Sequence, residues 1–113
     1  MSAKTQSILQ TRRECYLCRE LLFVRNTRAL QRHHVFPGSR RQMSEATGCV
    51  CWLCAEHHTG AGGVHRQRAL ALWLMQRCQL AYMQRHGRKD FMEKFGKDFM
   101  DIPNADLKTE DIL

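Results

Sequence analysis

The sequence predicts a single small domain of the α+β class with little sheet. Two short segments rich in β-forming residues are separated by a loop, which favours a pair of strands. From about residue 66, apolar residues recur at three- and four-residue steps, which indicates helix. Cysteine and histidine pairs at metal-ligand spacing flank the strand segments, so we expect a bound metal to support the small core of this 113-residue chain.

The N-terminal half is expected to hold an arm, a metal-binding turn and a strand. Residues 1–13 are polar without periodicity and predict a loose arm or a short helix. A core predicted over residues 14–65 follows, in which Leu21-Leu-Phe-Val24 is a short apolar run with strand character. His33-His34-Val35-Phe36 is also strand-like, and Pro37-Gly38 is a strong turn signal that ends it.

A loop and a second strand complete the predicted core. Residues 38–48 have no clean period and predict a loop with room for one helical turn. Cys49-Val-Cys-Trp-Leu53 is the second strand candidate. Strand alternation places Cys49, Cys51 and Leu53 on one face, so we expect the two cysteines to pack in the core.

Residues 66–101 form the predicted helical part. A long helix runs to residue 86, where Gly87 is a natural stop, and Cys78 lies on its apolar face. A shorter helix begins near residue 90 and carries three phenylalanines at four-residue steps, with a glycine interrupting it. An acidic tail covers residues 102–113.

The charge of the chain is unevenly placed. Residues 1–89 carry 15 Lys and Arg against 4 Asp and Glu, a net of +11, whereas residues 90–113 carry 3 against 7, a net of −4. Thirteen of the 18 basic residues are arginine, which binds phosphate through a planar, two-pronged group. This pattern favours a nucleic-acid partner, and a basic surface that only keeps the protein soluble is the alternative.

The apolar pattern predicts neither a membrane span nor secretion. The longest apolar run, Ala69–Met75, has seven residues, against about 20 for a spanning helix. The first residues lack the apolar stretch of a signal peptide. We therefore expect a cytoplasmic protein, and in such a reducing compartment cysteine clusters hold metal more often than they form disulfides.

Two ligand pairs of equal spacing predict a structural zinc site. Cys15-x2-Cys18 and Cys54-x2-His57 lie 36 residues apart and together make a Cys3His set. Four protein ligands leave no open position on a tetrahedral ion, which is typical of structural zinc. Either cysteine of the second strand could replace Cys54 or His57, although core packing is their expected role.

Four of the six histidines predict a second, catalytic metal site. His33 and His34 precede the loop, His58 directly follows the second ligand pair, and His65 lies seven residues further. Imidazole binds divalent metals through a neutral nitrogen and accepts a proton from water near pH 7. Adjacent strand residues point to opposite faces, so His33 and His34 can serve one site only where the strand ends or twists.

The order of these motifs resembles the HNH endonuclease family, whose ββα-metal fold is close to treble-clef zinc proteins. The resemblance is carried by Cys15-x2-Cys18, by His33-His34-Val35 and by Leu53-Cys54-x2-His57-His58. It covers about residues 15–101. More narrowly, the segment from His33 to His65 and the segment Arg88–Lys97 are similar to small phage and prophage proteins of HNH type.

The resemblance implies metal-dependent hydrolysis of DNA phosphodiester bonds, in a recombination or DNA-processing role inside a bacterial host cell. His34 becomes the general base, while His33 and His58 bind a catalytic Mg²⁺, Mn²⁺ or Zn²⁺, with His65 as a further ligand candidate. The implied structural zinc ligands are Cys15, Cys18, Cys54 and His57. The arginines that flank the site and are expected to bind DNA phosphates, in single-stranded, duplex or branched substrates, are Arg40, Arg41, Arg66 and Arg68.

The sequence departs from the family pattern at two positions. His57 stands where the common motif has its fourth cysteine, and histidine is an equally good zinc ligand. The middle asparagine of the motif falls near Cys49, and residues 37–103 contain no asparagine. Because that asparagine orients the base in the family, Glu45 or a backbone carbonyl has to hold His34 instead, unless the site is inactive.

Two non-catalytic functions compete with this hypothesis. A zinc module that binds nucleic acid or a protein partner would explain the cysteines and the charge, but it gives four histidines no role. A partner-binding protein could instead use its acidic, phenylalanine-rich C-terminal helix. Phe91, Phe95 and Phe99 more often pack against a neighbouring helix, which disfavours this second alternative.

Overall fold

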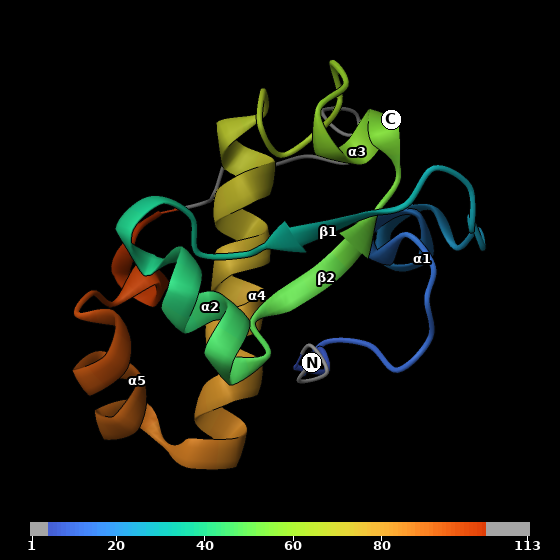
Figure 1. The fold of residues 1–113 in the computed structure, drawn as a ribbon. Coiled ribbons are helices and arrows are strands. Elements are labelled where there is room, and N and C mark those ends of the chain that lie inside the picture. The colour runs from blue at the N-terminus through green and yellow to red at the C-terminus, as the bar shows by residue number, and fades with distance from the viewer. Residues whose placement is uncertain (1–4, 104–113) are drawn as a thin grey trace.

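The computed structural model describes residues 5–103 and has a small α+β fold with a two-stranded sheet (Figure 1). The acidic tail beyond residue 103 lies outside the described residues. In the described part of the chain, no helix is both long enough and apolar enough to cross a bilayer. The elements in chain order are α1 (Tyr16–Leu22), β1 (Gln31–His34), the 3-10 turn η1 (Gly38–Arg40), α2 (Arg41–Thr47), β2 (Val50–Leu53), α3 (Ala55–His58), α4 (Arg68–His86), α5 (Arg88–Phe95) and the 3-10 turn η2 (Phe99–Asp101).

The two strands pair antiparallel and set the register of the histidines. Arg32 lies opposite Trp52, and His33 lies opposite Cys51. The second strand falls where the sequence predicts it. The first begins earlier than predicted and ends at His34, so that Val35 and Phe36 leave the strand and enter the core.

The predicted strand at Leu21–Val24 is wrong. Its first two residues complete helix α1, and Phe23 ends that helix in the left-handed region with φ 58°. The Cys15 thiol accepts a hydrogen bond from the Cys18 amide, and the Cys18 carbonyl accepts one from the Val24 amide at 3.1 Å. This closed turn leaves the β-forming side chains without a partner strand, so local turn geometry overrides strand propensity.

The segment predicted as a loop, residues 38–48, contains more helix than expected. The turn η1 leads directly into α2, which has seven residues. The Ser44 hydroxyl at the centre of α2 is buried and accepts a hydrogen bond from the Phe36 amide. Tertiary contacts of this kind stabilise a short helix whose sequence shows no clear period.

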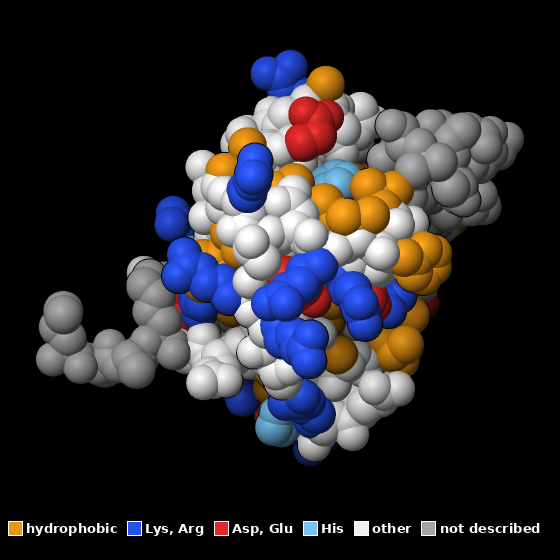
Figure 2. Space-filling model, turned by 90° about the vertical axis from the view of Figure 1, so that its right-hand side faces the viewer, with side chains coloured by type: hydrophobic (Ala, Val, Ile, Leu, Met, Phe, Trp, Pro, Cys, Tyr) orange, Lys and Arg blue, Asp and Glu red, His pale blue; other side chains and the backbone are white. Residues whose placement is uncertain are grey.

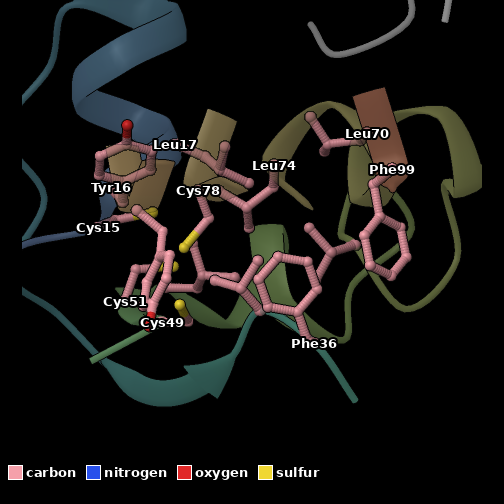
Figure 3. Packing of buried hydrophobic residues seen from close by; sticks show 14 of the residues in the cluster. Cys15, Tyr16, Leu17, Phe36, Cys49, Cys51, Leu70, Leu74, Cys78 and Phe99 are labelled. Carbon is pink, nitrogen blue, oxygen red and sulfur yellow. The ribbon is translucent and has the colours of Figure 1, made fainter. Parts of the chain in front are cut away.

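The core lies between the sheet and the long helix α4 (Figure 3). Leu70, Leu74 and Cys78 are fully buried on one face of α4, as the four-residue spacing predicts. Cys49 and Cys51 face them from the sheet side, which confirms the expected core role of both cysteines. The helix itself begins at Arg68, two residues later than predicted.

The phenylalanines of the C-terminal segment close the other end of the core. The Phe36 ring lies 4.7 Å from the Phe95 ring and 5.0 Å from the Phe99 ring, measured between centroids. Phe91 is completely buried as well. Because these rings are inside the protein, a function that displays them to a partner would require the C-terminal segment to unpack.

Candidate metal centres

Four buried side chains from two distant segments form a compact cluster of potential ligands. The sulfur atoms of Cys15, Cys18 and Cys54 lie 3.6, 3.3 and 3.5 Å from Nδ1 of His57, and the Cys18 and Cys54 sulfurs are 3.9 Å apart. A tetrahedral zinc ion with Zn–S of about 2.3 Å and Zn–N of about 2.0–2.1 Å requires edges of about 3.6 Å for S···N and about 3.8 Å for S···S. The cluster therefore has the size and ligand set to bind a metal such as zinc.

The local turns explain how these four ligands meet. Cys15 is the N-cap of α1 and Cys54 is the N-cap of α3, so both pairs begin at the start of a helical turn. The Asn26 carbonyl accepts a hydrogen bond from the Cys15 amide, and its side-chain amide donates to the Cys18 sulfur at 3.7 Å. Asn26 thus supports the ligands from outside the cluster, in the manner of outer-shell partners in metal sites.

Burial makes the thiols of this cluster dependent on a cation. Desolvation raises the pKa of Cys15, and it raises the pKa of Cys18 to about 12, with the neighbouring Cys15 adding to the effect. A metal binds the thiolate form, so its positive charge has to compensate for the cost of burying thiolates. Without an ion these thiols are therefore expected to stay protonated, and binding of a metal releases their protons.

A second cluster consists of His33, His58 and His65. One ring nitrogen from each histidine lies within 4.8 Å of the others. The His58 and His65 Nε2 atoms are 3.0 Å apart, and the His33 ring centroid lies 5.3 and 5.5 Å from the His58 and His65 centroids. Three imidazoles at these separations can share one divalent ion and leave positions open for water or substrate.

Three different elements bring these histidines together. His33 lies in β1, His58 is the last residue of α3, and His65 follows in the loop before α4. The loop turns back on α3 because the Val64 amide donates to the His57 carbonyl and the His65 amide donates to the His58 carbonyl. The segment from Cys54 to His65 therefore contributes two ligands to each cluster.

The electrostatics of the second cluster favour neutral imidazoles. His33 is only 7% exposed, and burial, together with the nearby His58, His65 and His34, lowers its pKa to about 3. Burial likewise lowers the pKa of His58. Neutral imidazole is the form that binds metal. The Gln31 side-chain carbonyl contacts Nδ1 of His58, which leaves Nε2 directed at His65.

His34 occupies a different position, next to a carboxylate. Its Nε2 lies 3.1 Å from Oε1 of Glu45 in α2. Both Glu45 oxygens also accept hydrogen bonds from the Arg32 guanidinium, at 3.0 and 2.6 Å, and these bonds lower the pKa of Glu45 to about 2. An ionised carboxylate only accepts hydrogen bonds, so Nε2 of His34 carries a proton, and in the neutral form of this imidazole Nδ1 is the nitrogen with the free lone pair.

One pocket of about 320 Å³ joins these groups. It is lined by all four histidines, together with Arg32, Pro37, Gly38 and Arg41. Strand alternation gives His33 and His34 opposite faces of β1, but His34 is the last residue of the strand, and both side chains line the same pocket at this end. The structure thus brings together every histidine for which the sequence predicts a catalytic role.

The four arginines predicted to bind DNA are more dispersed. Arg41 lines the histidine pocket, and the Arg66 guanidinium donates to the nearby Thr59 carbonyl. Arg40 donates to the Phe95 carbonyl at 2.7 Å and lies over the Phe99 ring, so it anchors the C-terminal segment. Arg68 lines another pocket, between α4 and η2. Of these four predicted arginines, only Arg41 lines the pocket of the histidines.

Three supporting residues, Asn26, Gln31 and Arg32, are absent from the sequence-based site. Gln31 and His33 alternate on one face of β1, which is a signal that could have identified Gln31. Arg32 alternates with His34 in the same way, whereas Asn26 acts through a folding contact that no spacing rule indicates. Comparisons of the chain with protein-family models, with curated proteins and with solved structures gave no match.

Proposed function

We propose that the protein is a metal-dependent DNA endonuclease of the HNH type, with a structural zinc site and a separate catalytic site. The observation that carries this proposal is the pocket in which three metal-ligand histidines adjoin a fourth histidine held by a carboxylate. Structural zinc alone requires none of these four imidazoles. Their convergence supports a hydrolytic site over a purely structural zinc module.

His33, His58 and His65 would hold the catalytic ion. When bound, a divalent ion supplies positive charge that offsets the negative charge growing on phosphate in the transition state. The chain positions these ligands through Gln31 on His58 and through the hydrogen-bonded loop that carries His65.

His34 would act as the general base. With Nε2–H donated to Glu45, the free Nδ1 can take a proton from the attacking water. A base of this kind contributes about 10²- to 10⁴-fold in rate. Glu45 would take the role of the asparagine that the family motif has and this chain lacks, because it fixes the ring orientation and tautomer of His34. Its own orientation is fixed by Arg32.

The nucleic-acid substrate is supported by charge. Among the basic residues within 1–89, Arg41 lines the pocket and Arg66 follows His65 directly in the chain. Arginine pairs well with phosphate, and phosphate contacts position a nuclease on its substrate.

The test is incubation of the zinc-replete protein with supercoiled plasmid and Mg²⁺, Mn²⁺ or no added ion. We expect nicking that depends on the added ion and that is abolished by His34→Ala, with zinc content and far-UV circular dichroism unchanged. His86→Ala, at an exposed histidine on α4, is the matched control and should cleave normally. Cleavage by the His34→Ala protein would remove His34 from the mechanism. Absence of cleavage by the wild-type protein with any ion would favour the non-catalytic zinc module.

A further inference from the structure

A second pocket, here called the arm pocket, lies between the N-terminal arm (residues 5–13) and the sheet. Its volume is about 250 Å³. Arg12 and Arg13 line it from the arm, and Arg32 and Trp52 line it from the strands. None of the described residues that line it is acidic. The nuclease hypothesis assigns no role to this pocket.

The arm is held against β2 by specific hydrogen bonds. The Ser7 hydroxyl donates to the Val50 carbonyl, and the Ile8 amide donates to the Gly48 carbonyl at 2.9 Å. The Gln10 side-chain carbonyl accepts a hydrogen bond from the Trp52 amide at 2.6 Å. These contacts precede Arg12 and Arg13 directly, so the two arginines project from an ordered segment.

The indole of Trp52 provides a stacking surface inside this pocket. The side chain is half-buried, and the Arg13 guanidinium lies over its ring at 4.2 Å from the centroid. Tryptophan and arginine planes are the groups on which proteins stack nucleic-acid bases. A base in a continuous duplex is already stacked on both faces, so only an unpaired base can reach an indole in a pocket.

The arm pocket also has positive charge that the protein itself does not neutralise. Within residues 5–103, the Arg12 guanidinium has no hydrogen-bond or ion-pair partner, and its side chain is exposed. Viewed from the side on which α1 lies in Figure 1, Lys and Arg side chains gather in a band across the molecule, with a few Asp and Glu side chains among them (Figure 2). Such a band can follow a phosphate backbone.

Arg32 connects the arm pocket to the histidine pocket. It lines both pockets, and its guanidinium holds the Glu45 carboxylate that binds His34. Arg32, His34 and Trp52 share one face of the sheet, because Arg32 pairs with Trp52 across the strands and precedes His34 by two residues. A nucleotide in the arm pocket would thus be a near neighbour of the phosphate at His34.

From these contacts we infer that the arm pocket binds an unpaired nucleotide next to the cleaved bond, with its base on Trp52 and its phosphate on Arg12. The substrate class is then DNA with unpaired nucleotides, such as a single strand or the stretches that negative supercoiling unpairs in a plasmid, and not relaxed continuous duplex. This inference rests on the proposed function for its position relative to the cleaved bond, whereas the binding itself can be tested without cleavage.

The experiment measures the affinity of the zinc-replete protein, without added Mg²⁺ or Mn²⁺, for a fluorescein-labelled single strand and for the same strand annealed to its complement. We expect tighter binding of the single strand. Trp52→Leu should weaken single-strand binding by about tenfold or more and leave duplex binding nearly unchanged, and Trp52→Tyr should retain most of the affinity because it keeps an aromatic face. Equal wild-type affinity for both forms, or unchanged single-strand binding by Trp52→Leu, would overturn the inference.

A charge variant tests the phosphate contact independently of the indole. Arg12→Gln should reduce the slope of log affinity against log salt for the single strand by about 0.7, the value for one lost phosphate contact. Lys89→Gln removes the same charge from an exposed position on α5 and should leave the slope unchanged. If Arg12→Gln behaves like Lys89→Gln, the assigned phosphate contact is wrong. Failure to cleave both supercoiled plasmid and single-stranded DNA would contradict the proposed nuclease and would not alter these binding outcomes.

Discussion

The chemistry of His34 depends on a single carboxylate. Glu45 is kept ionised by the Arg32 guanidinium and accepts the Nε2 proton of His34. This arrangement leaves only Nδ1 able to act as a base. The sequence indicated Glu45 as one of two groups that could hold His34, but it could not indicate that Arg32 holds Glu45, because that contact depends on the packing of α2 against β1.

Glu45→Gln should lower kcat for plasmid nicking by about tenfold or more with KM nearly unchanged, because the neutral amide holds the imidazole less strongly and no longer supports the positive charge that forms on it. The measurement is steady-state cleavage in the presence of the preferred ion. Glu93→Gln, at an exposed glutamate on α5, is the charge-matched control and should retain full activity. A Glu45→Gln enzyme with unchanged kcat would show that the carboxylate does not position the base.

Cys15→Ser should prevent stable zinc binding and unfold the domain, because three ligands cannot replace a closed tetrahedral set and the buried site has lost its cation. Zinc content and thermal unfolding measure this effect. Cys51→Ala is the comparison: Cys51 is equally buried but lies outside the ligand cluster. Cys51→Ala should lower the free energy of unfolding by only about 1 kcal/mol, because it leaves a small cavity. A folded, zinc-replete Cys15→Ser protein would contradict the zinc assignment.

At the scale of elements, β-forming residues predicted the second strand, and three- and four-residue periodicity predicted the long helix. The helix has one buried face, and burial imposes the pattern that the sequence displays, as at Leu70, Leu74 and Cys78. Helices α1 and α2 were missed because each has only seven residues. Elements so short are stabilised by caps and by distant contacts, such as Ser44 with the Phe36 amide, and not by their own pattern.

The end of α2 offers a test of how the arm is attached. Gly48 has φ +79°, and a β-carbon there would lie 2.4 Å from the Gln6 carbonyl oxygen of the arm. Gly96, which ends α5 with φ +72°, has open space around the same position. Gly96→Ala should therefore lower the free energy of unfolding by about 1 kcal/mol, from backbone strain alone. Gly48→Ala should lower it clearly more, because the added β-carbon also meets the arm. Urea unfolding with zinc present measures both, and equal costs would show that the arm does not pack closely at Gly48.

At the scale of the whole molecule, the two clusters of metal ligands meet at one short segment, since His57 belongs to the first cluster and His58 to the second. The sequence predicted both sets, because ligand types at fixed spacing are visible in the chain. The arm pocket was not predictable in this way. It depends on the arm docking against β2, and residues 5–13 have no periodicity from which that contact could be inferred.

The most direct test of the account is a Mn²⁺ titration of the zinc-replete protein, followed by electron paramagnetic resonance. A nuclease of this design should bind about one Mn²⁺ per chain in addition to tightly held zinc. His65→Ala should abolish Mn²⁺ binding without loss of zinc, because His65 belongs to the second cluster alone. His86→Ala should bind Mn²⁺ normally. A wild-type protein that binds no ion beyond its zinc would contradict the catalytic site and leave a structural zinc protein.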